Sequence, residues 1–180
     1  MNKTYTLHVA GLTRELPICK INDELSIAAF IMFSDIEMTV KCARELAKLI
    51  PECDTIITAE SKGIPLAYEL AKTIGKDYIV ARKHSKLYML EPVQVEVSSI
   101  TTKGVQSLCL DKRDFKKLTG KKVLIVDDVI SSGGSVLALE DLINQTGGKV
   151  VGKAAVLAEG VAIGRKDIIC LAELPLIKNT

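Results

Sequence analysis

The 180-residue sequence has no tryptophan, few other aromatic residues and almost no excess of either charge. Aromatic side chains make up 4% of the chain, and 24 Lys and Arg residues against 22 Asp and Glu residues give a formal net charge of +2. Proteins that bind nucleic acids usually combine a strongly basic surface with aromatic side chains on which bases stack. We therefore expect no nucleic-acid partner.

Long apolar runs and paired cysteines are also missing. No run reaches the ~18 residues that suggest a membrane span, and the first residues lack the continuous apolar stretch of a signal peptide. The five cysteines are far apart and include no C-x-x-C pair, so the sequence indicates neither a disulfide framework nor a zinc site. We expect a cytoplasmic protein with reduced cysteines and no membrane partner.

The abundant residues are aliphatic. Hydrophobic residues make up 48% of the chain. They recur at helical spacing over residues 34–50, with Pro51 as a stop, over 63–75 and over about 134–145. Short strand-like runs alternate with these segments: DTIITAE, DYIVA, KKVLIV, KVVGKAAVLA and DIICLAEL. This alternation predicts an α/β domain with a mainly parallel sheet, and since ~100–200 residues is an ordinary domain size, we assign residues 1–180 to a single domain.

Two segments depart from this alternation. Residues 1–30 alternate weakly and contain Gly11 at a predicted turn, so they are expected to form a short hairpin before the main fold. Residues 82–103 are rich in charge, and only VQVEV within them alternates, which predicts a hairpin or a mobile flap. Long connections of this kind often carry function.

One motif carries most of the functional information: VLIVDDVISSGGS at residues 123–135. Asp127 and Asp128 follow a strand-like run, at the carboxyl end where open parallel sheets bind ligands. The loop after them consists of Ser131, Ser132, Gly133, Gly134 and Ser135. Backbone N–H groups and hydroxyls at the start of a helix bind a phosphate monoester. Carboxylates instead suit hydroxyl donors or a divalent metal. The alternative is an ordinary strand-to-helix turn with two aspartates at the end of the sheet.

Two better-known phosphate motifs are absent from the sequence. Neither G-x-G-x-x-G after a strand nor G-x-x-x-x-G-K-[ST] occurs, which disfavours a dinucleotide-binding fold and a nucleoside triphosphatase. The motif instead resembles the signature of the type I phosphoribosyltransferases, which bind 5-phosphoribosyl 1-diphosphate, and the chain looks most like their purine branch of adenine and xanthine phosphoribosyltransferases. The resemblance implies that Asp127 and Asp128 contact the ribose hydroxyls, and a magnesium ion indirectly or through the substrate. It also implies that residues 131–135 hold the 5-phosphate.

The resemblance implies a fold as well. Members of the family have a central, mainly parallel sheet flanked by helices, a small N-terminal hood and a flexible flap. In this chain the hood would comprise about residues 1–30 plus the C-terminal end, and the flap would comprise about residues 83–106. A flap that closes over the site would exclude water, which competes for the activated ribose.

A second loop, within TAESKGIPLA, joins another strand-like run to a helix. Its residues are Glu60, Ser61, Lys62 and Gly63. A cation and small residues at a helix N-terminus suit an anion, although a lysine in a turn is more often simply solvated. Three further basic residues follow the next strand: Arg82, Lys83 and Lys86. Their charge alone is equally typical of an exposed face. In the family both segments bind the diphosphate, the second often across a dimer interface, so the resemblance implies a homodimer.

The base site is the least defined part of the resemblance. Glu159 precedes Gly160 at a strand end where xanthine-specific members carry a Lys-Gly pair. Because a carboxylate accepts hydrogen bonds, it favours the exocyclic amine of adenine over the carbonyl oxygens of xanthine. Glu159 and Val129 are therefore the predicted base contacts, although Glu159 is also compatible with an exposed loop acid. Cys109 falls near the position of an acidic residue that adenine-specific members carry in their flap, and Asp111 is close enough to replace it.

These observations favour an enzyme that transfers the phosphoribosyl group to a purine base, with magnesium, and releases diphosphate. Adenine is the preferred base, ahead of xanthine or guanine, and the role would be nucleotide salvage. A non-catalytic regulator that senses phosphoribosyl diphosphate is the alternative from another class. Such regulators usually carry a DNA-binding module, for which the residues before Ser26 are too few and carry no basic cluster.

Overall fold

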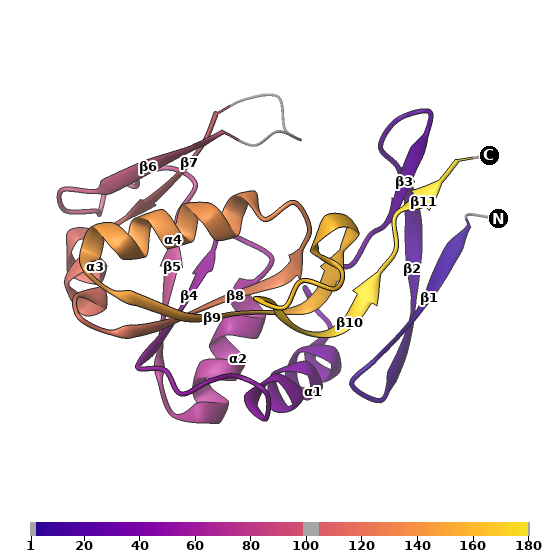
Figure 1. Cartoon of the computed structure of the whole chain (residues 1–180), viewed down its shortest axis with the longest axis horizontal. Helices are drawn as coiled ribbons and strands as arrows, with labels where there is room; N and C mark the ends of the chain where they lie inside the picture. Colours follow the sequence, from indigo (N-terminus) through magenta and orange to yellow (C-terminus); the bar gives the residue numbers. More distant parts are fainter. Residues whose placement is uncertain (1–2, 99–104, 180) are drawn as a thin grey trace.

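The computed structural model describes residues 3–98 and 105–179, and Figure 1 shows a layered core with a small sheet beside one end of it. The strands are β1 (Thr4–Val9), β2 (Leu12–Lys20), β3 (Leu25–Ala28), β4 (Thr55–Ala59), β5 (Asp77–Ala81), β6 (Val93–Ser98), β7 (Val105–Leu110), β8 (Lys122–Ile130), β9 (Lys149–Glu159), β10 (Ile169–Leu174) and β11 (Ile177–Lys178). The helices are α1 (Ile36–Ala47), α2 (Ile64–Ile74), α3 (Lys112–Leu118) and α4 (Gly134–Thr146), with a short 3-10 helix η1 (Gly160–Ala162).

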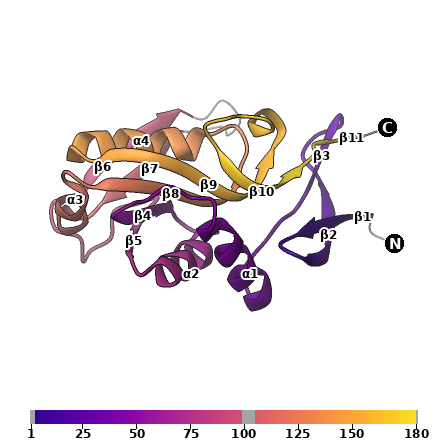
Figure 2. The same ribbon diagram turned by 60° about the horizontal axis from the view of Figure 1, so that its bottom comes forward.

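A five-stranded sheet forms the centre of the molecule. Its order is β10-β9-β8-β4-β5, and every neighbouring pair is parallel. Helices α1 and α2 cover one face and α4 covers the other (Figure 2). Because helices cover both faces, all five residues of β4 are buried, as is usual for a parallel sheet. The predicted fold class, a mainly parallel sheet flanked by helices, is confirmed.

The predicted helices exist, and their ends have local causes. Helix α1 begins after Asp35, whose carboxylate accepts a hydrogen bond from a backbone N–H of the first turn, and it ends at Ala47 rather than Ile50. Helices α2 and α4 end at Gly75 and Gly147, which both adopt the left-handed conformation that closes a helix. The short helix α3 was not predicted.

The two ends of the described chain meet in a second sheet of order β1-β2-β3-β11, antiparallel throughout (Figure 1). The hairpin expected in the first thirty residues is β1–β2. Ala10 and Gly11 at its turn have φ values of 52° and 71°, the positive values that a two-residue hairpin turn requires. We call this four-stranded sheet the hood. Its strands come from the two segments that were expected to form a hood, about residues 1–30 and the C-terminal end.

The segment expected to form a flap, about residues 83–106, contains β6 and only the first residues of β7, so the hairpin β6–β7 extends beyond it. Val95 and Leu108 of this hairpin are buried in the same apolar cluster as α4. Residues 99–104, which join the two strands, lie outside the described residues, so the closing movement expected of residues 83–106 stays a prediction. No helix in the described ranges is long and apolar enough to cross a membrane.

Candidate functional site

Asp127 and Asp128 lie in β8 where the core sheet opens. Strand β8 pairs with β4 only as far as Ile125, but it pairs with β9 to its last residue. The aspartates are therefore inside the strand rather than after it, beyond the point where β4 has stopped pairing. The alternation of side chains also breaks here, since Val126 and Val129 both pack into the cluster that contains α1 and α2.

Within the part of the chain that the structure describes, the protein supplies too few hydrogen-bond donors and positive charges to stabilise both carboxylates in their ionised form. The Asp128 side chain is 3% exposed, and its Oδ2 has no hydrogen-bond partner within the described residues. Lys62 Nζ lies 3.0 Å from this oxygen, close enough for an ion pair but not oriented as a hydrogen bond. Burial and then the proximity of Asp128 raise the pKa of Asp127 to about 8. A ligand that brings a cation or hydroxyl donors would complete this site.

The loop after β8 leads into the N-terminus of α4. Gly133 caps this helix with a φ of +85°, a left-handed conformation that glycine adopts without strain. Because no side chain caps α4, its first N–H groups are available to an anion. Ser131 and Ser132 lie in the loop, whereas Gly134 and Ser135 belong to the first turn of the helix. The predicted phosphate site is thus half loop and half helix.

The second predicted loop lies directly against the aspartates. Gly63 caps α2, and a Cβ atom there would come within 2.8 Å of Asp127 Oδ1 and 2.5 Å of Thr58 Oγ1. Only glycine fits such an approach. The sequence did not point to Thr58, a buried residue of β4. Lys62 of the same loop forms an ion pair with Asp128. The loop therefore supplies both the close backbone contact with Asp127, through Gly63, and a cation for Asp128.

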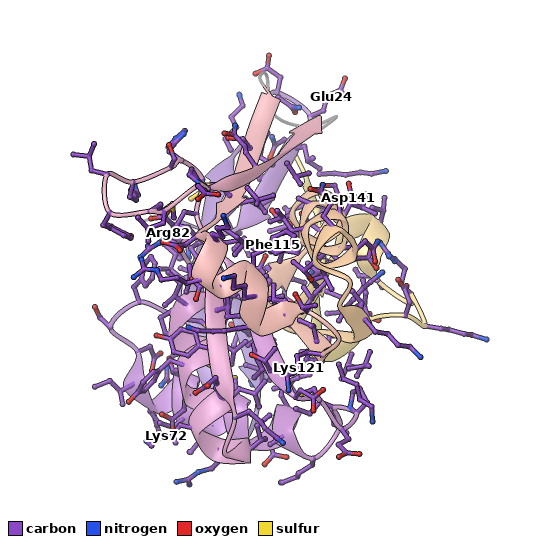
Figure 3. All side chains as sticks on the ribbon, turned by 90° about the vertical axis from the view of Figure 1, so that its left-hand side faces the viewer. Glu24, Lys72, Arg82, Phe115, Lys121 and Asp141 are labelled. Carbon is purple, nitrogen blue, oxygen red and sulfur yellow. The ribbon has the colours of Figure 1, made fainter. Side chains whose placement is uncertain are left out.

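Glu60 connects this loop to the basic segment after β5. Its carboxylate lies 3.4 Å from Arg82 Nη1 and accepts a hydrogen bond of 3.2 Å from the Lys83 backbone N–H. The Lys83 N–H and the Arg82 charge lower the pKa of Glu60. Ser61 and the Lys83 side chain are exposed, and Lys86 is partly buried. Figure 3 shows Arg82 near α3 on the side of the molecule that carries the β6–β7 hairpin.

A cavity of about 320 Å³ lies between the hood and these loops. Its lining consists of Ile27, Ala28, Ala29, Phe30, Ile31, Lys62, Val129, Ser131, Glu159 and Leu174. Both predicted base contacts, Val129 and Glu159, are among these residues, and most of the others are apolar. Burial raises the pKa of Glu159, while the charge of Lys62 acts in the opposite direction. A mostly apolar ligand with a polar edge suits such a cavity.

Asp111 has a structural role that the sequence did not indicate. It caps α3 by accepting a hydrogen bond of 2.8 Å from the Arg113 backbone N–H, and it pairs with the guanidinium of the same residue. It also accepts a hydrogen bond from the Leu90 backbone N–H. These donors hold the pKa of Asp111 well below its usual range. The interpretation of Asp111 as a replacement for a catalytic flap carboxylate stays a prediction, and in this structure its side chain is engaged by α3 and Arg113.

The site fits a divalent cation that takes most of its ligands from a substrate. The described residues contain no group of three or more metal-ligating side chains. Asp127 and the Oδ2 of Asp128, which has an ion pair with Lys62 but no hydrogen-bond partner among the described residues, nevertheless offer carboxylate oxygens, the ligands that magnesium prefers. Asp127 and Asp128 are the residues that would contact such an ion, directly or through the substrate.

Comparisons with curated proteins agree with this geometry. The family model of the phosphoribosyl transferase domain matches residues 35–174. The chain is 31% identical over 154 residues to an adenine phosphoribosyltransferase of Petrotoga mobilis, which covers 80% of this chain and 77% of that protein. It is also 33% identical over 111 residues to the purine biosynthesis transcriptional repressor PurR of Bacillus subtilis, but those residues are 61% of this chain and only 38% of PurR.

Solved structures show the same fold. The adenine phosphoribosyltransferase of Thermoanaerobacter pseudethanolicus superposes with a TM-score of 0.68 at 27% identity, over 79% of this chain and 84% of that one. The Giardia lamblia enzyme complexed with 9-deazaadenine has a TM-score of 0.65 at 18% identity, over 94% and 93% of the two chains, a likeness of fold alone. The chain therefore belongs to the phosphoribosyltransferase family, with the type I fold, on the purine branch that includes the adenine and xanthine phosphoribosyltransferases.

Proposed function

We propose that this protein transfers the 5-phosphoribosyl group from 5-phosphoribosyl 1-diphosphate to a purine base, with adenine preferred, and releases diphosphate. The observation that carries the proposal is the close approach of Gly63 to Asp127. This contact joins two anion-binding loops at one pair of carboxylates, beside a mostly apolar cavity. The donor has the same order of groups: a phosphate, a pair of ribose hydroxyls and a diphosphate.

Each part of the donor has a counterpart in this arrangement. Residues 131–135 and the N-terminus of α4 would bind the 5-phosphate, and the two aspartates would accept hydrogen bonds from the ribose hydroxyls. The diphosphate would lie against Ser61, Lys62 and Gly63, with Arg82, Lys83 and Lys86 nearby. Glu60 would hold Arg82 and the Lys83 backbone in place rather than bind diphosphate itself, because like charges repel.

The chemistry requires control of charge rather than a protein nucleophile. As diphosphate departs, the anomeric carbon gains positive charge and the leaving group gains negative charge. The carboxylates of Asp127 and Asp128 stabilise the positive charge at the anomeric carbon. Lys62 stabilises the negative charge on the diphosphate, once the donor draws Lys62 from its ion pair with Asp128. Magnesium, when bound, supplies further neutralisation of the diphosphate.

The base would occupy the cavity between the hood and the core. The aliphatic wall that includes Val129 would contact the faces of the ring, and Glu159 would accept a hydrogen bond from an exocyclic amine. A carboxylate at this position repels the carbonyl oxygens of xanthine and hypoxanthine. Adenine is therefore our first choice, with xanthine or guanine as the alternative.

The first experiment is a measurement of diphosphate release from phosphoribosyl diphosphate and magnesium. Adenine, guanine, hypoxanthine, xanthine and orotate are supplied one at a time. We expect turnover with adenine. Turnover with an oxopurine alone would move the specificity to the xanthine or guanine branch and would contradict the role of Glu159, and turnover with orotate would contradict a purine enzyme.

A ligand-sensing regulator is the second candidate. The similarity to PurR favours it, as does the engagement of Asp111 by α3 and Arg113, because a carboxylate held in a helix cap is less available for catalysis. The same experiment separates the two candidates. Tight binding of the donor without turnover of any base would make the regulator the leading candidate.

We also propose a homodimer and a cytoplasmic location, the latter because the substrates of nucleotide salvage are cytoplasmic metabolites. In the dimer, the segment from Arg82 to Lys86 would reach the partner's diphosphate site. Analytical ultracentrifugation of the protein and of an Arg82→Gln variant tests this proposal, because a monomeric unmodified protein would contradict it.

A further inference from the structure

Arg165 lies against the phosphate loop although it is distant from it in the sequence. A Cβ atom on Gly133 would be 3.3 Å from Arg165 Nη1, and no other described atom outside the neighbouring residues would be within 4 Å of it. The connection between β9 and β10 brings Arg165 to this position. Its backbone N–H bonds to the carbonyl of Ala162 in η1, which fixes the turn.

The guanidinium of Arg165 is held in place by the carboxylate of Asp167. Its Nε and Nη2 donate to the two carboxylate oxygens of Asp167, at 3.0 and 2.7 Å. Such a two-point pair fixes the plane of the guanidinium. Asp167 also pairs with Lys153 at 3.1 Å, and Lys153 pairs with Glu140 of α4 at 2.8 Å. Within the described residues, Nη1 is the guanidinium nitrogen that has no hydrogen-bond partner.

We propose that Arg165 binds the phosphate group held at the N-terminus of α4, and that Asp167 is its positioning residue. This inference rests on the proposed function, which places a phosphate monoester at that loop. Residues 131–135 are serine and glycine only, so the loop itself brings no positive charge. A phosphate monoester carries a charge of about −1.5 to −2 at pH 7. Nη1 supplies a charged donor at Gly133, in addition to the N–H groups of the helix.

The geometry requires arginine rather than lysine. An ammonium group is a single point charge, whereas a guanidinium donates to Asp167 through two nitrogens and still presents the third. Substitution of Arg165 should therefore weaken ligands that carry the 5-phosphate and spare ligands that bind only at the other loop. A lysine at this position should restore part of the affinity, because it restores the charge without the fixed orientation.

Ribose 5-phosphate and magnesium diphosphate are suitable probes, because neither depends on which base the protein uses. Isothermal titration of Arg165→Gln should show about a 10- to 100-fold loss of affinity for ribose 5-phosphate and no change for magnesium diphosphate. Asp167→Asn should show a smaller loss with the same selectivity. Lys166→Gln is the matched control, since it removes the same charge from the adjacent, exposed residue, and it should leave both affinities unchanged.

The outcomes separate this inference from the proposed function. Unchanged ribose 5-phosphate affinity in Arg165→Gln overturns the inference, and so does an equal loss for both probes, which would indicate a structural role. Gly133→Val places a side chain in the phosphate loop and should abolish ribose 5-phosphate binding. If Gly133→Val binds normally, or if the unmodified protein does not bind ribose 5-phosphate, the proposed phosphate site fails and the inference fails with it. If Gly133→Val loses binding and Arg165→Gln does not, only the inference fails.

Discussion

The protonation of Asp127 links the charge of single residues to ligand binding. Burial and the nearby Asp128 raise the pKa of Asp127 to about 8, so this carboxyl group keeps its proton at neutral pH when no ligand is bound. Magnesium and ribose hydroxyls both favour the ionised form, and binding should therefore release a proton. The affinity for the magnesium complex of phosphoribosyl diphosphate should increase as the pH rises from about 6.5 to about 8.5, by up to about tenfold per pH unit.

Calorimetry in two buffers with different ionisation enthalpies measures this proton release. Asp127→Asn removes the titrating group and should flatten the pH dependence, besides weakening the donor. Asp54→Asn is the control, because Asp54 precedes β4 at the opposite end of the sheet and its pKa is lowered, mainly by a hydrogen bond from the Lys122 backbone N–H. An affinity that does not vary with pH in the unmodified protein would contradict this account of Asp127.

At the scale of helices and strands, the sequence predicts those elements and loops that arise from a local pattern of residues. Strands buried on both faces and helices with one apolar stripe produce clear patterns, and both anion loops are recognisable because each follows a strand and opens a helix. Helix α3 has only seven residues and one buried side chain, Leu118, so it shows no helical period. Thr58 beside Gly63 and Arg165 beside Gly133 were not predicted, because these contacts join distant parts of the chain and no local pattern encodes them.

The role of Asp111 in α3 leads to a prediction about stability. Asp111→Ala removes the helix cap and leaves the Arg113 side chain and the Leu90 N–H without their acceptor. The free energy of unfolding should fall by about 1–3 kcal/mol, with no change in affinity for the donor. Asp114→Ala on the same helix breaks only an exposed pair with Lys117 and should cost less than about 0.5 kcal/mol.

Urea unfolding of both variants measures the difference in stability, and titration with phosphoribosyl diphosphate measures the affinity. A strong loss of turnover in Asp111→Ala at unchanged stability would support a catalytic role for this carboxylate. That result would also weaken the case for a regulator, since Asp111 would then contribute an acid to the reaction.

At the scale of the whole molecule, the hood and the core sheet contribute different parts of the site. The loops proposed to bind the 5-phosphate and the diphosphate both leave the core sheet, whereas one wall of the cavity, residues 27–31, comes from β3 and the segment after it. Strand β11 completes the hood with only two residues. Asn179, just after it, accepts a hydrogen bond of 2.6 Å from Ser26 Oγ and donates one of 2.9 Å to the Asn22 carbonyl. The Asn179 side chain therefore reinforces the backbone pairing that attaches this short strand to β3.

This division predicts that base binding and donor binding can be weakened separately. Asn179→Ala removes two hydrogen bonds worth about 0.5–1.5 kcal/mol each, which should loosen β11 and β3 and increase amide hydrogen exchange throughout the hood. The KM for adenine should increase, whereas the affinity for phosphoribosyl diphosphate should stay within about twofold, because no donor loop belongs to the hood. Lys178→Ala, an exposed change in the same strand, should leave exchange and both ligands unaffected. An equal loss of base and donor affinity in Asn179→Ala would mean that the hood supports the core sheet as a whole, and that the cavity is not an independent part of the site.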